Sequence, residues 1–172
     1  RWATHGAPTT LNAHPHQSGN VAVVHNGIVE NFKELRTELE AHGIEYKTDT
    51  DTETVALLTQ HYMSRGHSPR EASELTVGRL EGSFALAFLF HGEDDLLIAA
   101  RKGSPLAIGH GSGEVYIGSD AIALAPLTNK ITYLEEDDFA VLTRDSIKIW
   151  DKNGQLAKRS IRAIVIDTTH VD

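Results

Sequence analysis

The sequence predicts an α+β domain in which a group of helices is followed by antiparallel β-strands. Between residues 28 and 82, apolar side chains recur every three or four positions after helix-start sequences, which is typical of amphipathic helices. From residue 83 onward, short apolar segments are separated by turn sequences such as Gly111-Ser112-Gly113. Grouped helices followed by hairpins favour antiparallel layers over alternating βαβ units.

One buried strand is expected before the helices. Residues 21–24 (VAVV), between Asn20 and His25, are continuously apolar, which favours a strand covered on both faces. The dipeptide Asn26-Gly27 follows, and this dipeptide is frequent in short turns. We therefore expect the strand to end there, in a tight turn that leads into a helix.

Three helices are expected next. The first follows a capping-box sequence at residues 31–34 (NFKE) and stops at Gly43, and a short strand through Tyr46 is expected after it. The second and third follow capping-box sequences at residues 50–53 (TDTE) and 68–71 (SPRE). The third has proline at the first helical position, where proline is well tolerated.

Seven short strands are expected in the second half of the chain. Their ranges are 84–90, 96–100, 106–108, 115–117, 131–134, 139–142 and 147–150. A chain of 172 residues with 40% hydrophobic residues can fill one core, so a single domain is expected over residues 1–160. Residues 161–172 close without turn chemistry and are interpreted as the start of a linker.

Composition argues against several classes of function. The net charge is -8 and the lysines and arginines are scattered, so no basic face is available for nucleic acid or anionic lipid. No apolar run approaches the roughly 20 residues of a transmembrane helix, and the first residues lack the regions of a signal peptide. We therefore expect a cytoplasmic protein. The sequence has no cysteine, which excludes disulfides and a cysteine nucleophile within these residues.

Polar residues that can carry chemistry gather in three loops, at residues 1–16, 25–31 and 48–53. In the second loop, the side chain of Asn26 and the backbone N–H of Gly27 are two donors that can stabilise an oxyanion. A simple Asn-Gly turn is the alternative for this pair. The choice between the two interpretations stays open at this point.

The first and third loops supply a pair of opposite charges. Arg1 can bind a carboxylate through two parallel hydrogen bonds, and Asp51, near a helix start, can hold an ammonium group. Together these two side chains fit an amino acid. A surface arginine and an ordinary helix cap are the alternatives.

Histidines suggest a metal site as a rival interpretation. The side chains of His5, His14, His16 and His25, with Asp51, are of the types that ligate zinc. Surface histidine pairs rarely bind a metal, so the amino-acid site is favoured. We expect neither a metal nor a cofactor.

Blocks that include these residues resemble, in order and spacing, the glutaminase domain of the glucosamine-6-phosphate synthase family. The first four are residues 1–6 (RWATHG), 12–16 (NAHPH), 24–31 (VHNGIVEN) and 50–53 (TDTE). Three later blocks also match, at residues 103–106 (GSPL), 118–120 (GSD) and 134–138 (LEEDD). The resemblance thus covers nearly the whole chain. Amidotransferases that make phosphoribosylamine or asparagine share the Asn-Gly pair but are less similar in the tryptophan-containing first block.

The resemblance implies a fold and a reaction. This family belongs to the N-terminal-nucleophile hydrolases, so we expect a four-layer αββα sandwich of antiparallel sheets. The family pattern starts with a catalytic Cys-Gly-Ile and edge strands that the 172 residues do not contain. The expectation is therefore a sandwich that lacks its N-terminal strands and is inactive by itself. In the family, a thiolate attacks the side-chain amide of glutamine and ammonia leaves.

The resemblance also implies roles for individual residues. Asn26 and the Gly27 amide would form the oxyanion hole, Arg1 would bind the α-carboxylate of glutamine, and Asp51 would bind its α-ammonium. Gly27 also belongs to the substrate pocket. The other residues that the resemblance assigns to the pocket are Trp2, Thr4 and His5.

The implied partner, besides glutamine, is a sugar isomerase domain that converts fructose 6-phosphate to glucosamine 6-phosphate with the released ammonia. The resemblance places His14 near the boundary with that domain and leaves open a homodimer formed through it. A module that binds an amino acid without catalysis is the alternative function, because the chain has no cysteine.

Overall fold

The computed structural model describes residues 16–164. The strands in this range are β1 (His16–Ser18), β2 (Val21–Val29), β3 (Gly82–Phe90), β4 (Leu97–Lys102), β5 (Ala107–His110), β6 (Val115–Gly118), β7 (Lys130–Tyr133), β8 (Phe139–Leu142), β9 (Ile147–Trp150), β10 (Leu156–Ala157) and β11 (Arg162–Ala163). The helices are α1 (Phe32–Ala41), α2 (Asp51–Ser64), α3 (Pro69–Arg79) and α4 (Ala121–Leu124).

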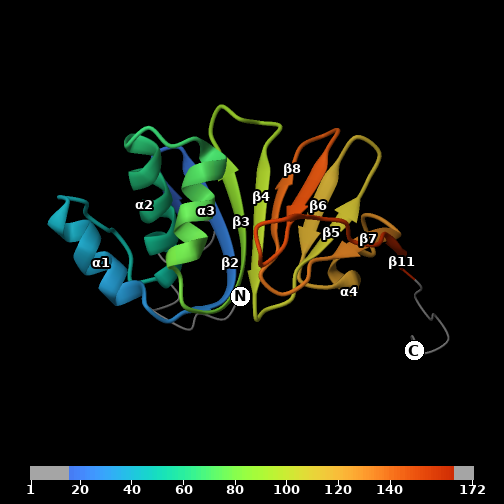
Figure 1. Cartoon of the computed structure of the whole chain (residues 1–172), viewed down its shortest axis with the longest axis horizontal. Helices are drawn as coiled ribbons and strands as arrows, with labels where there is room; N and C mark the ends of the chain where they lie inside the picture. Colours follow the sequence, from blue (N-terminus) through green and yellow to red (C-terminus); the bar gives the residue numbers. More distant parts are fainter. Residues whose placement is uncertain (1–15, 165–172) are drawn as a thin grey trace.

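Two antiparallel sheets form the middle layers of the molecule. The larger has seven strands in the order β1-β2-β3-β4-β8-β9-β10, and the smaller has four in the order β11-β7-β5-β6. Helices α2 and α3 lie against the β2–β3 side of the larger sheet (Figure 1). The one-turn helix α4 packs on the outer face of the smaller sheet through Leu124. The predicted αββα layer order is confirmed.

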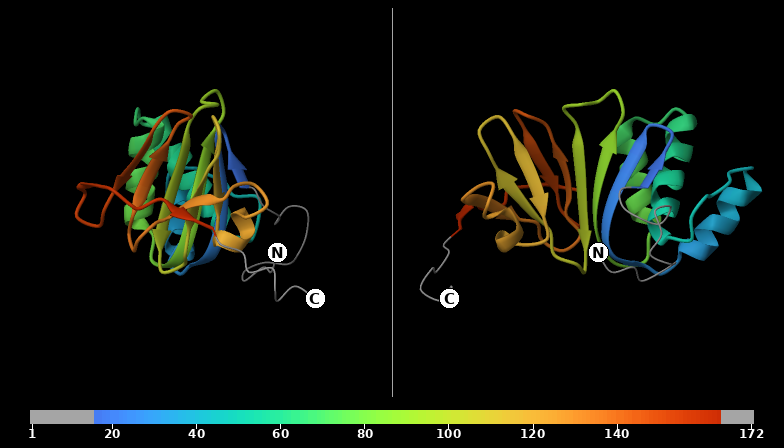
Figure 2. Two further views of the ribbon diagram at one scale, coloured as in Figure 1. Left: turned by 90° about the vertical axis from the view of Figure 1, so that its right-hand side faces the viewer. Right: turned by 180° about the vertical axis from the view of Figure 1, so that it is seen from behind.

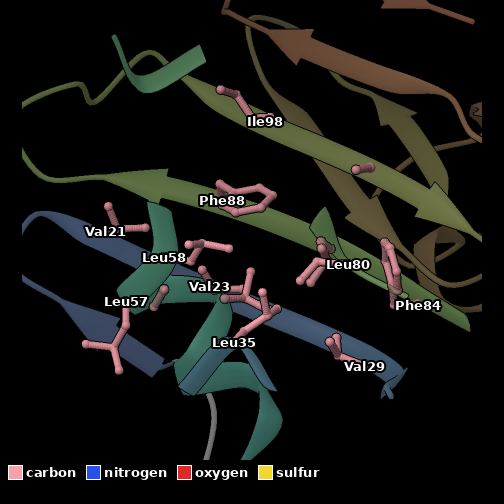
Figure 3. Close-up of a cluster of buried hydrophobic side chains, with 14 of the residues drawn as sticks. Val21, Val23, Val29, Leu35, Leu57, Leu58, Leu80, Phe84, Phe88 and Ile98 are labelled. Carbon is pink, nitrogen blue, oxygen red and sulfur yellow. The ribbon is translucent and has the colours of Figure 1, made fainter. Parts of the chain in front are cut away.

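The larger core lies between the seven-stranded sheet and the helices. Alternate residues of β2, namely Val21, Val23 and Val29, are at most 1% exposed and point toward the helices, as the two-residue period of a strand requires. Phe84 and Phe88 of β3 point the same way (Figure 3). Burying each such side chain contributes about 1.5–3 kcal/mol, so this face holds the helices against the sheet.

Small side chains line the opposite face of the same sheet, between the two sheets. Ala85, Ala99 and Ala140 are buried there and pack with Ile108 and Leu142. Ala99 is directly paired with Ala140 across β4 and β8. Small residues on this face allow the four-stranded sheet to pack closely against the larger sheet. The two sheets lie next to each other in both views of Figure 2.

The expected turn at Asn26-Gly27 is wrong. Strand β2 continues to Val29, with Asn26 paired to Ala85 and Gly27 paired to Phe84 in β3. The strand pairs with β3 along its whole length, and this tertiary pairing outweighs the local turn preference of the dipeptide. Asn26 and Gly27 therefore belong to the sheet itself.

The first expected capping box is also wrong, whereas the third is confirmed. The side chain of Asn31 does not cap α1. It joins two distant segments instead, since its amide donates to the carbonyl of Arg79 (2.8 Å) and its oxygen accepts from the backbone N–H of Glu81 (3.0 Å). At the start of α3, Ser68 and Glu71 make both reciprocal bonds of the box.

The seven expected strands are all present as β3 to β9, and the predicted bounds of β8 and β9 match the structure. The expected strand through Tyr46 is absent from the described region. Four short elements were not predicted: β1, β10, β11 and α4. Strand β11 pairs Arg162 with Ile131 of β7. No helix within residues 16–164 is both long enough and apolar enough to cross a membrane.

Candidate functional site

Asp51 and the end of β2 meet at the centre of the candidate site. Asp51 is the first residue of α2, and its Oδ2 accepts a hydrogen bond from the backbone N–H of Val29 at 2.9 Å. Val29 is two positions after Gly27. The fold thus brings the candidate ammonium-binding carboxylate to the strand that carries the candidate oxyanion donors, and Asp51 is only 4% exposed.

His25 lies on the helix side of β2, next to Asp51. Its Nδ1 is 2.9 Å from the hydroxyl of Thr52 and 3.9 Å from the carboxylate of Asp51, and the residue is 1% exposed. The sequence suggested His25 only as a zinc ligand, and its contact with α2 was not foreseen. No group of three or more metal-binding side chains is found among the described residues.

Asn26 points to the opposite face of the sheet and is exposed. The residue paired with it on β3 is Ala85, which is buried between the two sheets. An exposed carboxamide next to a backbone N–H is an arrangement that can donate two hydrogen bonds to one ligand oxygen.

Gly27 is required by the close approach of two other segments. Its φ is 103°, and a Cβ at this position would lie 2.1 Å from the carbonyl oxygen of Ser83 and 2.9 Å from the hydroxyl of Ser104. Both the backbone angle and the space therefore exclude other residues. The tight packing places the hydroxyls of Ser83 and Ser104 beside Gly27, 3.2 Å from each other.

The turn that carries Ser104 is held in place from a third segment. Gly103 has a φ of 77° and its backbone N–H donates to a carboxylate oxygen of Glu136 at 2.5 Å. A Cβ on Gly103 would lie 2.2 Å from the hydroxyl of Ser83. Residues 103–106 and 134–138 are two of the matching blocks of the sequence. The structure places Ser104 beside Gly27 and Glu136 against Gly103.

The start of α2 uses half of the expected capping box. The hydroxyl of Thr50 accepts from the backbone N–H of Glu53 at 3.4 Å. The carboxylate of Glu53 does not return this bond, and accepts instead from the backbone N–H groups of Lys47 (2.8 Å) and Thr48 (2.7 Å). Glu53 therefore holds the loop before the helix, and Asp51 lies between the two contacts.

Asn26 and Gly27 lie near the end of β2, and Asp51 contacts the same strand at Val29. The other candidate residues, Arg1, Trp2, Thr4 and His5, lie outside the described residues. His14 also lies outside them. Their roles stay predictions.

Comparison with known proteins points to one family. A model of the glutamine amidotransferase domain family matches residues 10–126, which is more than half of the chain. A glutamine–fructose-6-phosphate aminotransferase (isomerizing) from Bradyrhizobium diazoefficiens is 58% identical over 172 residues, covering 97% of this chain and 28% of that protein. The enzyme of the same name from Gluconobacter oxydans is 54% identical over 162 residues, covering 94% and 27%. The chain thus spans less than a third of these curated relatives.

Solved structures show the same fold. The glutamine phosphoribosylpyrophosphate amidotransferase from B. subtilis superposes with a TM-score of 0.69 at 26% identity, over 84% of this chain and 33% of that one. A structure described as the allosteric regulatory enzyme of purine biosynthesis gives 0.71 at 26% identity, over 88% and 33%. With the αββα sandwich, these matches show that the chain belongs to the glutamine amidotransferase domain family.

Proposed function

We propose that this chain is the glutamine-hydrolysing part of an enzyme that transfers ammonia to fructose 6-phosphate and makes glucosamine 6-phosphate. The observation that carries the proposal is the buried carboxylate of Asp51 at the end of the strand that presents Asn26 and Gly27. The acceptor sugar in this proposal, fructose 6-phosphate, is taken from the name of the relatives, glutamine–fructose-6-phosphate aminotransferase.

Recognition of glutamine is assigned to charges at both ends of its amino-acid backbone. Asp51 would accept hydrogen bonds from the α-ammonium, since Val29 N–H occupies part of its acceptor capacity and leaves the rest for a cation. Arg1 would bind the α-carboxylate through two parallel bonds. Trp2, Thr4 and His5 would complete the pocket, as the family resemblance implies.

The proposed chemistry is acyl transfer on the side-chain amide. A nucleophile adds to the amide carbon, and the negative charge that develops on the oxygen is stabilised by the Asn26 side chain and the Gly27 N–H. The carbon–nitrogen bond then breaks, the nitrogen takes up a proton, and ammonia leaves. Water releases glutamate from the acyl intermediate. The 172 residues contain no cysteine, so the thiol of this reaction lies outside them in our proposal.

A second candidate is a module that binds an amino acid without hydrolysing it. The absence of cysteine from the 172 residues is the observation that favours it. In that case Asp51 and Arg1 would serve recognition alone. The sugar isomerase domain would then have no ammonia to receive from this site.

The test measures glutamate and glucosamine 6-phosphate made from glutamine and fructose 6-phosphate by the protein as its gene encodes it. Formation of both products supports the enzyme, whereas tight binding of glutamine without turnover favours the binding module. A polypeptide of these 172 residues alone is expected to release no glutamate, because it has no thiol. Steady, metal-independent glutamate release by that polypeptide at enzyme-like rates would overturn the mechanism.

A further inference from the structure

Arg36 of α1 reaches into the loop that precedes Asp51. The residue is only 8% exposed. Its Nε donates to the hydroxyl of Thr54 (2.9 Å), and its Nη2 donates to the carbonyl oxygens of Thr48 (2.9 Å) and Thr50 (2.6 Å). One guanidinium group therefore holds the chain on both sides of Asp51.

The same guanidinium group lies over two aromatic rings. Its central carbon lies 4.1 Å from the centre of the Tyr46 ring and 5.4 Å from that of Phe32. Planar stacking combined with donors at fixed angles is a property of arginine that lysine cannot copy. The loop between α1 and α2 is therefore shaped around Arg36.

Glu53 provides the opposite charge in this cluster. Its carboxylate lies 3.7 Å from Nη2 of Arg36 and accepts from the backbone N–H and the hydroxyl of Thr48, at 2.7 and 2.8 Å. Two buried ions thus compensate each other and together fix the loop from Lys47 to Thr54. A buried pair of this kind is strongly destabilised when one partner is removed alone.

Among the buried carboxylates of the described residues, Glu53 is paired with Arg36 and Asp138 with Arg159, and Asp51 is the one without a lysine or arginine partner. Its one ion-pair contact there is with His25, at 3.9 Å, which counts as an ion pair only if the histidine is protonated. Arg36 is satisfied by Glu53 and by loop carbonyls, so it does not neutralise Asp51. The charge of Asp51 stays available for a cationic ligand group.

We propose that Arg36 is a positioning residue for recognition of the substrate ammonium. It acts through Asp51, by fixing the carbonyl of the preceding residue, Thr50, and the hydroxyl of Thr54 one turn later. The inference rests on the proposed function, in which Asp51 binds the α-ammonium of glutamine. A positioning role of this kind affects affinity more than turnover, because Arg36 acts on the carboxylate that binds the ammonium group and not on the amide that reacts.

The test is a double-mutant cycle with Arg36→Met and Asp51→Asn in the protein as its gene encodes it. Dissociation constants for L-glutamate, the product, are measured by calorimetry, and KM and kcat for glutamine are measured in the same variants. Each single variant is expected to weaken glutamate binding at least about fivefold, and the double variant is expected to bind no more weakly than Asp51→Asn alone. The effect on KM is expected to exceed the effect on kcat.

Two further variants separate positioning from general stability. Arg79→Met removes an exposed arginine whose Nη1 bonds to Glu38 of the same helix α1 and to the hydroxyl of Tyr62. It leaves the Asp51 loop intact, so glutamate binding is expected to stay unchanged even if the melting temperature falls. Thr54→Val removes one acceptor of Arg36 with little change in shape, and keeps the test available if Arg36→Met does not fold. It is expected to weaken binding about twofold to fivefold, again only when Asp51 is present.

The outcomes distinguish the two proposals. If Asp51→Asn leaves glutamate binding unchanged, the proposed function of Asp51 is wrong. If Asp51→Asn weakens binding but Arg36→Met or Thr54→Val weakens it by the same factor with and without Asp51, the positioning role of Arg36 is wrong. Unchanged binding in a folded Arg36→Met variant would have the same meaning.

Discussion

Asp51 and Val29 are joined by a 2.9 Å hydrogen bond from the backbone N–H of Val29 to the carboxylate, which ties the first residue of α2 to the end of β2. The two residues are in direct contact, although the whole of α1 lies between their segments in the sequence. It fixes the position of Asp51 at Val29, two positions after Gly27.

Asp51→Asn is expected to raise KM for glutamine about tenfold to a hundredfold, because it removes a charge-assisted hydrogen bond worth about 1.5 to 3 kcal/mol. The asparagine oxygen can still accept from Val29, so the fold is expected to survive. Asp120→Asn is the matched control, since Asp120 caps α4 by accepting from the backbone N–H of Ala123, at the other sheet. Equal effects of the two variants on KM would show that Asp51 has only a structural role at the start of α2.

Asn26→Ala is expected to lower kcat far more than it raises KM. The variant removes one of two donors to the developing oxyanion, and such a donor contributes about 2.7 to 4 kcal/mol to stabilisation of the transition state. Because Asn26 is exposed, the free energy of unfolding measured in urea should change little. A loss of glutamine binding as large as the loss of turnover would indicate a distorted strand instead.

Gly27→Ala is expected to destabilise the protein severely or to prevent folding. The new Cβ would lie 2.1 Å from the carbonyl oxygen of Ser83, in addition to the strain of a φ of 103°. Gly154→Ala is the matched control: Gly154 has a φ of 74° but no atom within 4 Å of the new Cβ. Its cost should be limited to backbone strain of about 1 to 3 kcal/mol. Urea unfolding of both variants measures the difference, and similar losses would contradict the close contact.

His110 is expected to contribute to a loss of stability in mild acid. Burial lowers the pKa of His110 below its ordinary value of 6.5, and the nearby charge of Lys130 lowers it further. Its Nε2 lies 2.7 Å from the hydroxyl of Thr132. As the pH falls below about 6.5, the unfolded chain takes up a proton at this residue and the folded protein does not, so the stability that is present above this pH is progressively lost until the lower folded pKa is passed.

His110→Gln removes this titration and retains a hydrogen-bonding side chain. The free energy of unfolding, measured in urea at several values between about pH 7.5 and pH 5, should therefore depend less steeply on pH in the variant. The absolute stability of the variant is not the test, because packing changes as well. An identical slope in both proteins would exclude His110 as a source of the pH dependence.

The sequence by itself determined the features that depend only on residues close together in the chain, within one or two helical turns or a hairpin. The capping box of Ser68 and Glu71 starts α3 as expected, and the apolar segments of β8 and β9 form strands with the predicted bounds. Such elements are local, because their hydrogen bonds and turns join residues a few positions apart. The matching blocks around Asn26 and Asp51 indicated the family for a similar reason, since they are read without knowledge of the fold.

Only the tertiary structure decided how these segments meet. Local preference placed a turn at Asn26-Gly27, and pairing with β3 along the whole strand made it part of β2 instead. Local preference made Asn31 a helix cap, and its side chain bonds instead to the last residue of α3, Arg79, and to Glu81 after it. Arg36 gave no signal at all in the sequence, yet it is buried against the loop before Asp51. The physical reason is the same in each case: contacts between distant segments bury more surface and satisfy more hydrogen bonds than the local alternative, and they exist only after the chain has folded.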